Sequence, residues 1–381
     1  MKTVYLDNSA TTPLCAEAER AITGAFSLFA NPSSLHSAGI EAASLLDSSR
    51  GSLIASSGLG HGYTAVFCGS GSEANNLAIA GVCRCDRHFA SKRIIISDSE
   101  HPSVYATALS LAERGFETVP VPTRGGALDL DALERELKKG AALVSIMSVN
   151  NETGAEYDIA SALALCRKIC PDALFHTDAV QGFMRIPLCG GCDAISVSAH
   201  KIGGPKGCGA LFVSEKTLRR RAVSPVIFGG GQEFGLRSGT ENTPYIAGFA
   251  AAARRWSENR GEFSARLDRL YSLTADAAEA AGCRVNRPAS AVSHIVSVTL
   301  PGIKSQVMLS FLSSKGIFVS SGSACSSKDK KLSRALTAFG LCDRDADCTV
   351  RVSISPDNTP EDIAAFGSAL AEGCGRLVRI R

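Results

Sequence analysis

Short apolar runs alternating with amphipathic segments constrain the fold of this 381-residue chain more than any other feature. The runs predict buried strands, and the segments between several of them predict helices at 73–82, 104–113, 129–139 and 159–169. Strands that alternate with helices form a mainly parallel sheet covered on both faces, with ligands beyond the carboxyl ends of the strands. The predicted strands are 65–67, 93–96, 117–119, 142–147, 174–177, 194–198 and 210–213.

The pattern changes near Trp256, where a long polar segment rich in Ala and Arg predicts a connecting helix. The segments after it predict a smaller α+β domain that ends in a helix from residue 360 to about residue 380. We expect a large domain at 14–256 and a small domain built from 1–13 and 257–381. A chain of this length is too long for one small domain.

The charge balance indicates neither a polyanionic partner nor a membrane surface. The chain has 40 Lys and Arg against 37 Asp and Glu, a net charge of 40 − 37 = +3. No signal peptide is visible, and no run approaches the ~20 apolar residues of a transmembrane helix. We therefore expect a cytoplasmic protein that binds no nucleic acid.

Fourteen cysteines are scattered along the chain. In a large chain without an export signal, they are expected to be reduced thiols. Cys83 and Cys85 form one local pair, and Cys189 and Cys192 form another with two glycines between them. Neither pair has the second pair of a zinc site or a thioredoxin-like context. Ordinary buried or surface thiols are the favoured interpretation, and no metal site is predicted.

Lys201 ends an apolar strand and is followed at once by a glycine-rich turn, in the segment SAHKIGGPKG at 198–207. A lysine at a strand end can project into a cleft, and the glycines allow close approach of the backbone to a ligand. Desolvation or nearby cations lower the pKa of an amine, so that it can condense with a carbonyl group. The alternative is an ordinary exposed lysine.

A second motif, HTDAVQ at 176–181, also follows an apolar run. An acid at that strand end, Asp178, can pair with a protonated pyridine nitrogen and keep the ring cationic, which makes it electron-withdrawing. Asp178 on its own also fits the N-cap of a helix.

A third motif, GSGSEANNL at 69–77, follows a strand and opens a helix. Glycines, small hydroxyls and free backbone N–H groups at a helix N-terminus can hold a phosphate. The motif matches neither the nucleotide P-loop nor the dinucleotide pattern. A plain capped helix start has the same residue types.

A fourth motif, SSGSACSS at 320–327, precedes the basic run KDKK. Its small polar residues predict a loop that carries one thiol, Cys325. A nearby cation favours the nucleophilic thiolate, and a flexible loop could carry the thiol into a pocket and out again. A loop cysteine with no role fits equally well.

Together these segments resemble the cysteine desulfurases of the NifS/IscS type, within the class V aminotransferase group of fold-type I pyridoxal-phosphate (PLP) enzymes. The resemblance extends from YLDNSATTP at 5–13 to RVS at 351–353, and SAHK and the segment 320–326 are its most diagnostic parts. It implies an α/β fold with a large, mainly parallel mixed sheet flanked by helices, and a smaller α+β domain with a catalytic cysteine loop at about 321–335. It also implies pyridoxal 5′-phosphate as the cofactor and L-cysteine as the substrate.

The resemblance assigns roles around the cofactor ring. Lys201 is the lysine that binds the cofactor and moves the proton at the substrate Cα. Asp178 pairs with the ring nitrogen, and Gln181 binds the phenolic oxygen. His101 stacks on the ring and takes part in proton transfer, and Asn151 contacts both cofactor and substrate.

Further roles implied by the resemblance concern the phosphate and the substrate. Thr240 reaches the phosphate of a partner subunit, which implies a homodimer. Arg351 binds the substrate carboxylate with help from Asn31, and a planar guanidinium suits a bidentate bond of this kind. Taken singly, Arg351 also fits an ion pair, Asn31 a turn and His101 a core histidine. The phosphate is held by Gly71, Ser72, Ser198 and His200.

The implied activity converts L-cysteine to L-alanine, leaving the sulfur as a persulfide on Cys325. A sulfur-acceptor protein, such as an iron–sulfur scaffold or a sulfur carrier for thio-cofactor or tRNA biosynthesis, then receives it. A selenocysteine lyase, or another class V lyase or transaminase, is the alternative within the same fold. A thiol-carrier or metal-binding protein is the alternative from another class, but it has no use for a cofactor site built around Lys201.

Overall fold

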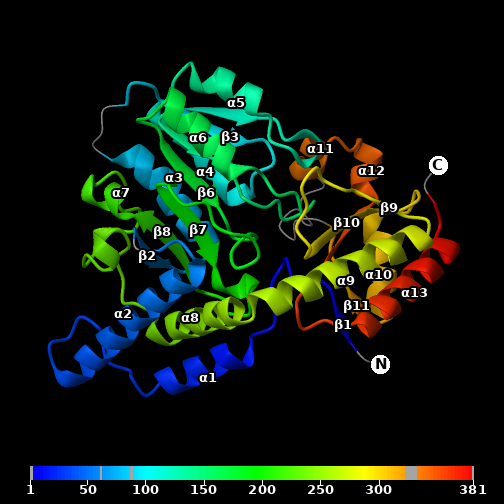
Figure 1. Cartoon of the computed structure of the whole chain (residues 1–381), viewed down its shortest axis with the longest axis horizontal. Coiled ribbons are helices and arrows are strands. Elements are labelled where there is room, and N and C mark those ends of the chain that lie inside the picture. The colour runs from blue at the N-terminus through cyan, green and yellow to red at the C-terminus, as the bar shows by residue number, and fades with distance from the viewer. Residues whose placement is uncertain (1–2, 61, 86–88, 322–332, 380–381) are drawn as a thin grey trace.

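The computed structural model describes residues 3–60, 62–85, 89–321 and 333–379 (Figure 1). Its centre is a seven-stranded sheet in the order β2-β8-β7-β6-β5-β3-β4. The five strands from β7 to β4 pair in parallel, whereas β8 runs antiparallel to both of its neighbours. These strands confirm the seven predicted ones and the mainly parallel mixed sheet. They are β2 (Tyr63–Cys68), β3 (Arg93–Ser97), β4 (Glu117–Val121), β5 (Leu143–Ser145), β6 (Leu174–Asp178), β7 (Ala194–Ser198) and β8 (Gly209–Ser214).

Both faces of this sheet are buried, because alternate side chains point to opposite faces and both sets are apolar. In β3, Ile94 and Ile96 pack in the cluster that contains Leu77 of α3, whereas Ile95 packs in the cluster that contains Leu133 of α5. All three isoleucines are fully buried. The four predicted helices are confirmed as α3 (Gly71–Arg84), α4 (Pro102–Ser110), α5 (Leu130–Leu137) and α6 (Ile159–Ile169), with a 3-10 turn, Leu111–Arg114, after α4.

A second group of elements follows the large sheet in the sequence. Its three-stranded antiparallel sheet has the order β12-β10-β9, and the two-residue strands β1 and β11 pair in parallel beside it. The strand β1 comes from the N-terminus, as expected for a small domain that includes residues 1–13. The strands are β1 (Val4–Tyr5), β9 (Arg284–Val285), β10 (Ile295–Thr299), β11 (Ile317–Phe318) and β12 (Thr349–Ser353).

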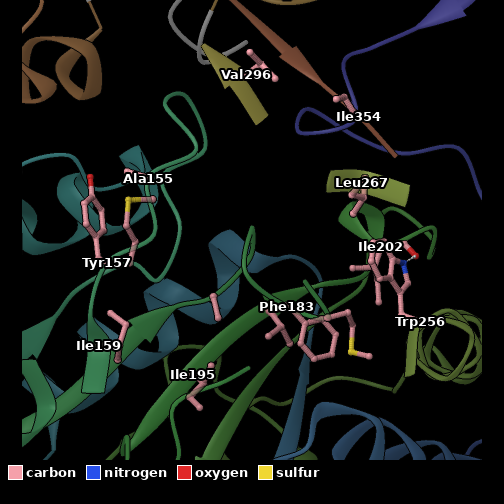
Figure 2. Close-up of a cluster of buried hydrophobic side chains, with 14 of the residues drawn as sticks. Ala155, Tyr157, Ile159, Phe183, Ile195, Ile202, Trp256, Leu267, Val296 and Ile354 are labelled. Atoms are coloured by element: carbon pink, nitrogen blue, oxygen red, sulfur yellow. Dashed lines mark hydrogen bonds between the residues drawn. The ribbon is translucent and has the colours of Figure 1, made fainter. Parts of the chain in front are cut away.

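The predicted connecting helix is two helices, α8 (Thr243–Glu258) and α9 (Arg260–Ala280), which meet at Asn259. Trp256 in the last turn of α8 donates its Nε1–H to the carbonyl of Ile202 at 3.0 Å, so α8 is fastened to the turn after Lys201 (Figure 2). The proposed domain boundary at residue 256 falls inside α8 and stays a prediction. The other helices are α1 (Ala16–Ala25), α2 (Ser37–Ser57), α7 (Glu215–Arg219), α10 (Ser305–Ser314), α11 (Arg334–Phe339), α12 (Asp343–Asp347) and α13 (Pro360–Arg376).

A helix that crosses a lipid bilayer needs a long run of apolar residues. Across the described residues, no helix has both this length and this composition.

Candidate active site

A cavity of about 270 Å³ opens at the carboxyl ends of β6 and β7, next to the start of α3. Asp178 is the last residue of β6, Ser198 is the last residue of β7, and Ser70 caps α3. This is the edge where an open α/β sheet is expected to bind its ligand. The predicted site residues that line the cavity together are Gly71, Ser72, His101, Asn151, Asp178, Gln181, Ser198, His200, Lys201 and Arg351.

Lys201 lies in a 3-10 turn directly after β7 and lines the cavity. Its Nζ donates to the carbonyl oxygens of Ser9 at 2.5 Å and Ala10 at 2.8 Å. Burial, together with the positive charges of Arg351 and Arg185, lowers the pKa of the Lys201 amine to about 7. Near neutral pH a large share of this amine is therefore unprotonated and nucleophilic.

Asp178 is buried and belongs to a chain of hydrogen bonds that reaches His101. Asn75 Nδ2 donates to Asp178 Oδ2 at 2.7 Å and to Ser103 Oγ at 2.9 Å. Ser103 Oγ lies 2.7 Å from His101 Nδ1, which also accepts from the Ser103 backbone N–H at 3.2 Å. Because a backbone N–H can only donate, Nδ1 is an acceptor and the ring proton lies on Nε2. Burial lowers the pKa of His101, so its ring is neutral at physiological pH.

The start of α3 forms a cradle for an anion. Ser70 is the N-cap and accepts from the Glu73 N–H at 3.1 Å. Gly71 and Ser72 line the cavity, and their N–H groups have no acceptor within the helix because they belong to its first turn. A Cβ added at Gly71 would lie 2.7 Å from a methyl of Val180 and 3.3 Å from Ser198 Cβ, so only glycine fits there. Ser198 Oγ is buried without a hydrogen-bond partner among the described residues.

His200 completes this side of the cavity as a neutral donor. Burial and the charges of Lys201 and Lys206 lower the pKa of His200 to about 4. Its Nδ1 lies 3.2 Å from Thr11 Oγ1. His200 therefore contributes a hydrogen bond, rather than a full positive charge, to an anion bound here.

Two more buried oxygens of residues that line the cavity have no partner among the described residues, namely Gln181 Oε1 and Ser9 Oγ. The Gln181 amide is held in place by its Nε2, which donates to the Ser9 carbonyl at 2.9 Å. Unpaired buried polar atoms are costly, so groups of this kind in a cavity indicate a polar ligand.

Arg351 enters the cavity from β12 and is only 3% exposed. It donates to Asp7 Oδ1 and to the Asn151 carbonyl, both at 2.8 Å, while its Nε has no partner in the described part of the chain. A buried cation at this position provides a binding site for a small carboxylate.

Two predicted site residues in the described part of the chain, Asn31 and Thr240, are not part of the cavity lining. Asn31 is exposed and accepts from the Ser33 N–H at 2.9 Å, which is the turn geometry that its sequence also suggested. Thr240 is exposed too, and its role toward a partner subunit stays a prediction. Cys325 lies outside the described residues.

The described residues on either side of the cysteine segment lie beside the cavity. Ser320 pairs with Arg351 through two backbone hydrogen bonds of 3.1 and 2.6 Å. On the other side, Ser333 caps α11 and donates to Glu152 Oε2 at 2.5 Å, next to Asn151. The chain therefore leaves and re-enters the described structure next to two residues that line the cavity.

Sequence reasoning missed several contributors to the site. The carbonyls of Ser9 and Ala10 are backbone groups, which carry no side-chain signal. Asn75 lies within the motif at 69–77, and Ser103 lies two residues after His101, but the role of both depends on α3 and α4 packing side by side. The order of the motifs along the chain predicted the site, whereas nothing in the sequence marked these two side chains as part of it.

The fold and the cavity, with a lysine after β7 and an acid after β6, place this protein among the α/β enzymes that use a lysine-bound cofactor. The chain belongs to the aminotransferase class-V family, whose model matches residues 4–366. It is 35% identical to a cysteine desulfurase of Sinorhizobium fredii, over 95% of this chain and 94% of that protein. A cysteine desulfurase IscS of Archaeoglobus fulgidus is 34% identical, over 94% of each chain.

Solved structures agree with this assignment. A NifS-like protein from Rickettsia africae matches with a TM-score of 0.85 and 31% identity, over 97% of this chain and 99% of that one. Another NifS-like protein matches with a TM-score of 0.90 and 29% identity, over 99% of this chain and all of the other. The resemblance to the NifS/IscS type is thereby confirmed along nearly the whole chain.

Proposed function

We propose that this protein is a PLP-dependent cysteine desulfurase that converts L-cysteine to L-alanine and passes the sulfur through Cys325. The observation that carries the proposal is a buried lysine of near-neutral pKa in a cavity that also contains a buried carboxylate and an anion cradle. The relatives named cysteine desulfurases support the same activity.

The residues around the cavity fit pyridoxal phosphate. The cradle of Gly71 and Ser198 has an unpaired hydroxyl for the phosphate, and Gln181 in the same cavity has an unpaired side-chain carbonyl oxygen. Asp178, fixed by Asn75 and by the Val180 N–H at 2.9 Å, would stabilise a protonated ring nitrogen. When bound, the cofactor acts as an electron sink for the charge that develops at the substrate Cα.

The chain's own residues supply binding and proton transfer. Arg351 binds the substrate carboxylate and so orients the Cα–H bond. Lys201 takes up the Cα proton, because its pKa of about 7 lets the amine act as a base at neutral pH. His101 Nε2, which carries the ring proton, donates a hydrogen bond toward the reacting groups.

The sulfur step assigned to Cys325 is balanced. The Cys325 thiolate attacks the sulfur of the bound cysteine, the bond between Cβ and sulfur breaks, and a proton is added to the carbon. The products are Cys325 persulfide and alanine. In support, Ser320 lies beside Arg351, and five extended residues span at most about 17 Å, enough to bring a thiol to this cavity.

A homodimer is part of the proposal. Phe29 is 89% exposed, Leu35 94% and Phe228 74%, an unusual amount of large apolar surface on a folded chain. Thr240 is exposed close to Phe228 in the sequence, where it could serve the phosphate of a second copy. Burial of these side chains between two subunits would complete both sites.

The decisive experiment records the visible absorbance of the purified protein and then supplies L-cysteine with a reductant. We expect a yellow protein that forms sulfide and alanine in equal amounts. Sulfide and alanine formed without any need for Cys325 would transfer the function to another class V enzyme. A colourless protein that takes up no added PLP would contradict the proposal altogether.

Substrate recognition by Arg351 can be tested with Arg351→Lys. A lysine keeps the charge but cannot make a bidentate bond, so KM for L-cysteine should rise about 10- to 100-fold, the loss of about 1.5–3 kcal/mol of charged hydrogen bonding. The cofactor absorbance should stay as in the wild type, because Arg351 binds the substrate. Arg284→Lys, at an exposed arginine of β9 paired with Asp345, is the matched control and should keep the wild-type KM. An unchanged KM in Arg351→Lys would remove this residue from substrate binding.

A further inference from the structure

The loop at 187–193, just before β7, carries two cysteines of contrasting exposure. Cys192 is fully buried, whereas Cys189 is partly exposed. The two glycines between them lie at the surface, and a Cβ added at Gly190 would meet no atom within 4 Å. A small molecule in solution can therefore approach Cys189.

Contacts from other elements fix the shape of this loop. Tyr63 Oη accepts from the Gly191 N–H at 2.9 Å and donates to the Cys192 carbonyl at 2.7 Å. Arg167 donates to the Gly191 carbonyl at 3.1 Å and to Asp193 at 2.6 Å. Gly191 has a φ of +91°, which favours glycine and turns the chain back between the cysteines. The backbone that joins the two cysteines is thus held in one shape by the fold.

The thiols differ in acidity because they interact. A hydrogen bond from the Cys192 thiol lowers the pKa of Cys189 to about 7, against the opposing effect of burial. The same hydrogen bond and burial raise the pKa of Cys192. An accessible thiolate thereby lies next to a buried thiol that still holds its proton, and no disulfide joins the two.

We propose that Cys189 and Cys192 form a dithiol–disulfide redox site that reacts with low-molecular-weight disulfides. The Cys189 thiolate attacks a disulfide RSSR, which breaks the S–S bond, forms a mixed disulfide and releases one RS⁻. Cys192 then loses its proton and attacks the Cys189 sulfur, which forms the protein disulfide and releases the second RS⁻. Overall, the two thiols lose two electrons and two protons, and RSSR becomes two RSH.

This site is separate from the cavity of Lys201. The cysteine loop precedes Ala194 at the start of β7, whereas Ser198 and Lys201 follow at the end of the strand. The four steps along β7 span about 13 Å. The redox reaction therefore goes beyond the proposed function and does not depend on it.

A second pair of close thiols shows why access matters. The sulfurs of Cys283 and Cys374 lie 3.6 Å apart, but both residues are buried. A disulfide in solution cannot reach them in the folded protein. This pair is therefore an internal control, because its thiols are close together but are not exposed to solvent.

The test treats the full-length, reduced protein with glutathione disulfide and alkylates the remaining thiols after denaturation. Trypsin releases the peptide 186–201, in which Cys189 and Cys192 are the only cysteines. We expect this peptide to lose two hydrogens and both alkyl labels, while Cys283 and Cys374 stay labelled. In Cys192→Ser the reaction should stop at glutathione on Cys189, and in Cys189→Ser neither product should form. Cys342→Ser, at an exposed cysteine elsewhere, should behave as wild type.

The pH profile distinguishes a coupled pair from two separate thiols. In folded wild-type protein, alkylation of Cys189 should follow a midpoint near pH 7. In Cys192→Ala, which removes the donor, the midpoint should move up toward ~8.5, with a rate at pH 7 about threefold lower, whereas Cys192→Ser keeps a hydroxyl donor and should shift the midpoint less. Recovery of both labelled thiols after glutathione disulfide, or a mixed disulfide on Cys189 that Cys192 fails to displace, would overturn the proposal. So would a midpoint that both Cys192 variants leave unchanged.

Discussion

Lys201→Ala is expected to eliminate the visible absorbance band of the purified protein and to lower sulfide release from L-cysteine by about a thousandfold or more. The substitution removes both the amine that would hold the cofactor and the base that would move the Cα proton, and each loss alone is large. The two readouts are independent, because the absorbance reports cofactor attachment without any turnover. Exposed Lys216→Ala in α7 is the control and should keep both signals.

The pH dependence of cofactor uptake adds a second check on Lys201. Its pKa is lowered to about 7, so the neutral, reactive amine is the minor form below pH 7 and the major form above it. Uptake of PLP by protein freed of cofactor should therefore accelerate as pH rises through about 7, and level off above it. A profile centred near the ordinary lysine value of ~10.4 would mean that the folded chain leaves this amine unperturbed. If Lys201→Ala kept the wild-type absorbance band, Lys201 would not be the residue that holds the cofactor.

The sequence predicted most of the sheet because its central strands are buried on both faces and therefore contain runs of apolar residues. Residues 94–96 illustrate this, because these three consecutive isoleucines pack into two different hydrophobic clusters. Site residues such as Asp178 and Lys201 were predictable for a related reason, since parallel strands bring their carboxyl ends to one edge. The break at Asn259 was not, because its flanking residues favour helix on both sides and only the backbone there departs from it.

Contacts between segments far apart in the chain explain the remaining misses. Lys201 bonds to the carbonyls of Ser9 and Ala10, about 190 positions earlier, and no side chain announces such a contact. The interpretation of Cys189 and Cys192 as ordinary thiols stays a prediction. The redox role proposed for them draws on contacts with Tyr63 from β2 and Arg167 from α6, which only the folded chain brings to the loop.

Cys325→Ser is expected to lower sulfide release from L-cysteine by about 10³-fold or more while leaving the absorbance band intact. Serine keeps the size of the side chain but has no thiolate at neutral pH, so no nucleophile attacks the substrate sulfur. Cofactor binding should be unaffected, because Lys201, Asp178 and the anion cradle are retained. Mass spectrometry of the wild type after one turnover without reductant should find one added sulfur on the peptide that contains Cys325. Cys342→Ser should match the wild type in every readout.

The same variant separates cysteine desulfurase from the other class V activities. A transaminase or a selenocysteine-specific lyase has no need of a thiol at position 325, so Cys325→Ser would retain most of its activity. Retained alanine formation from L-cysteine in Cys325→Ser would argue for a related class V lyase that needs no thiol, even with the cofactor bound as proposed. Loss from L-cysteine with activity kept toward selenocysteine would instead assign the thiol to sulfur transfer alone. That outcome is chemically reasonable, because selenium leaves carbon more easily than sulfur and does not require the attacking Cys325 thiolate.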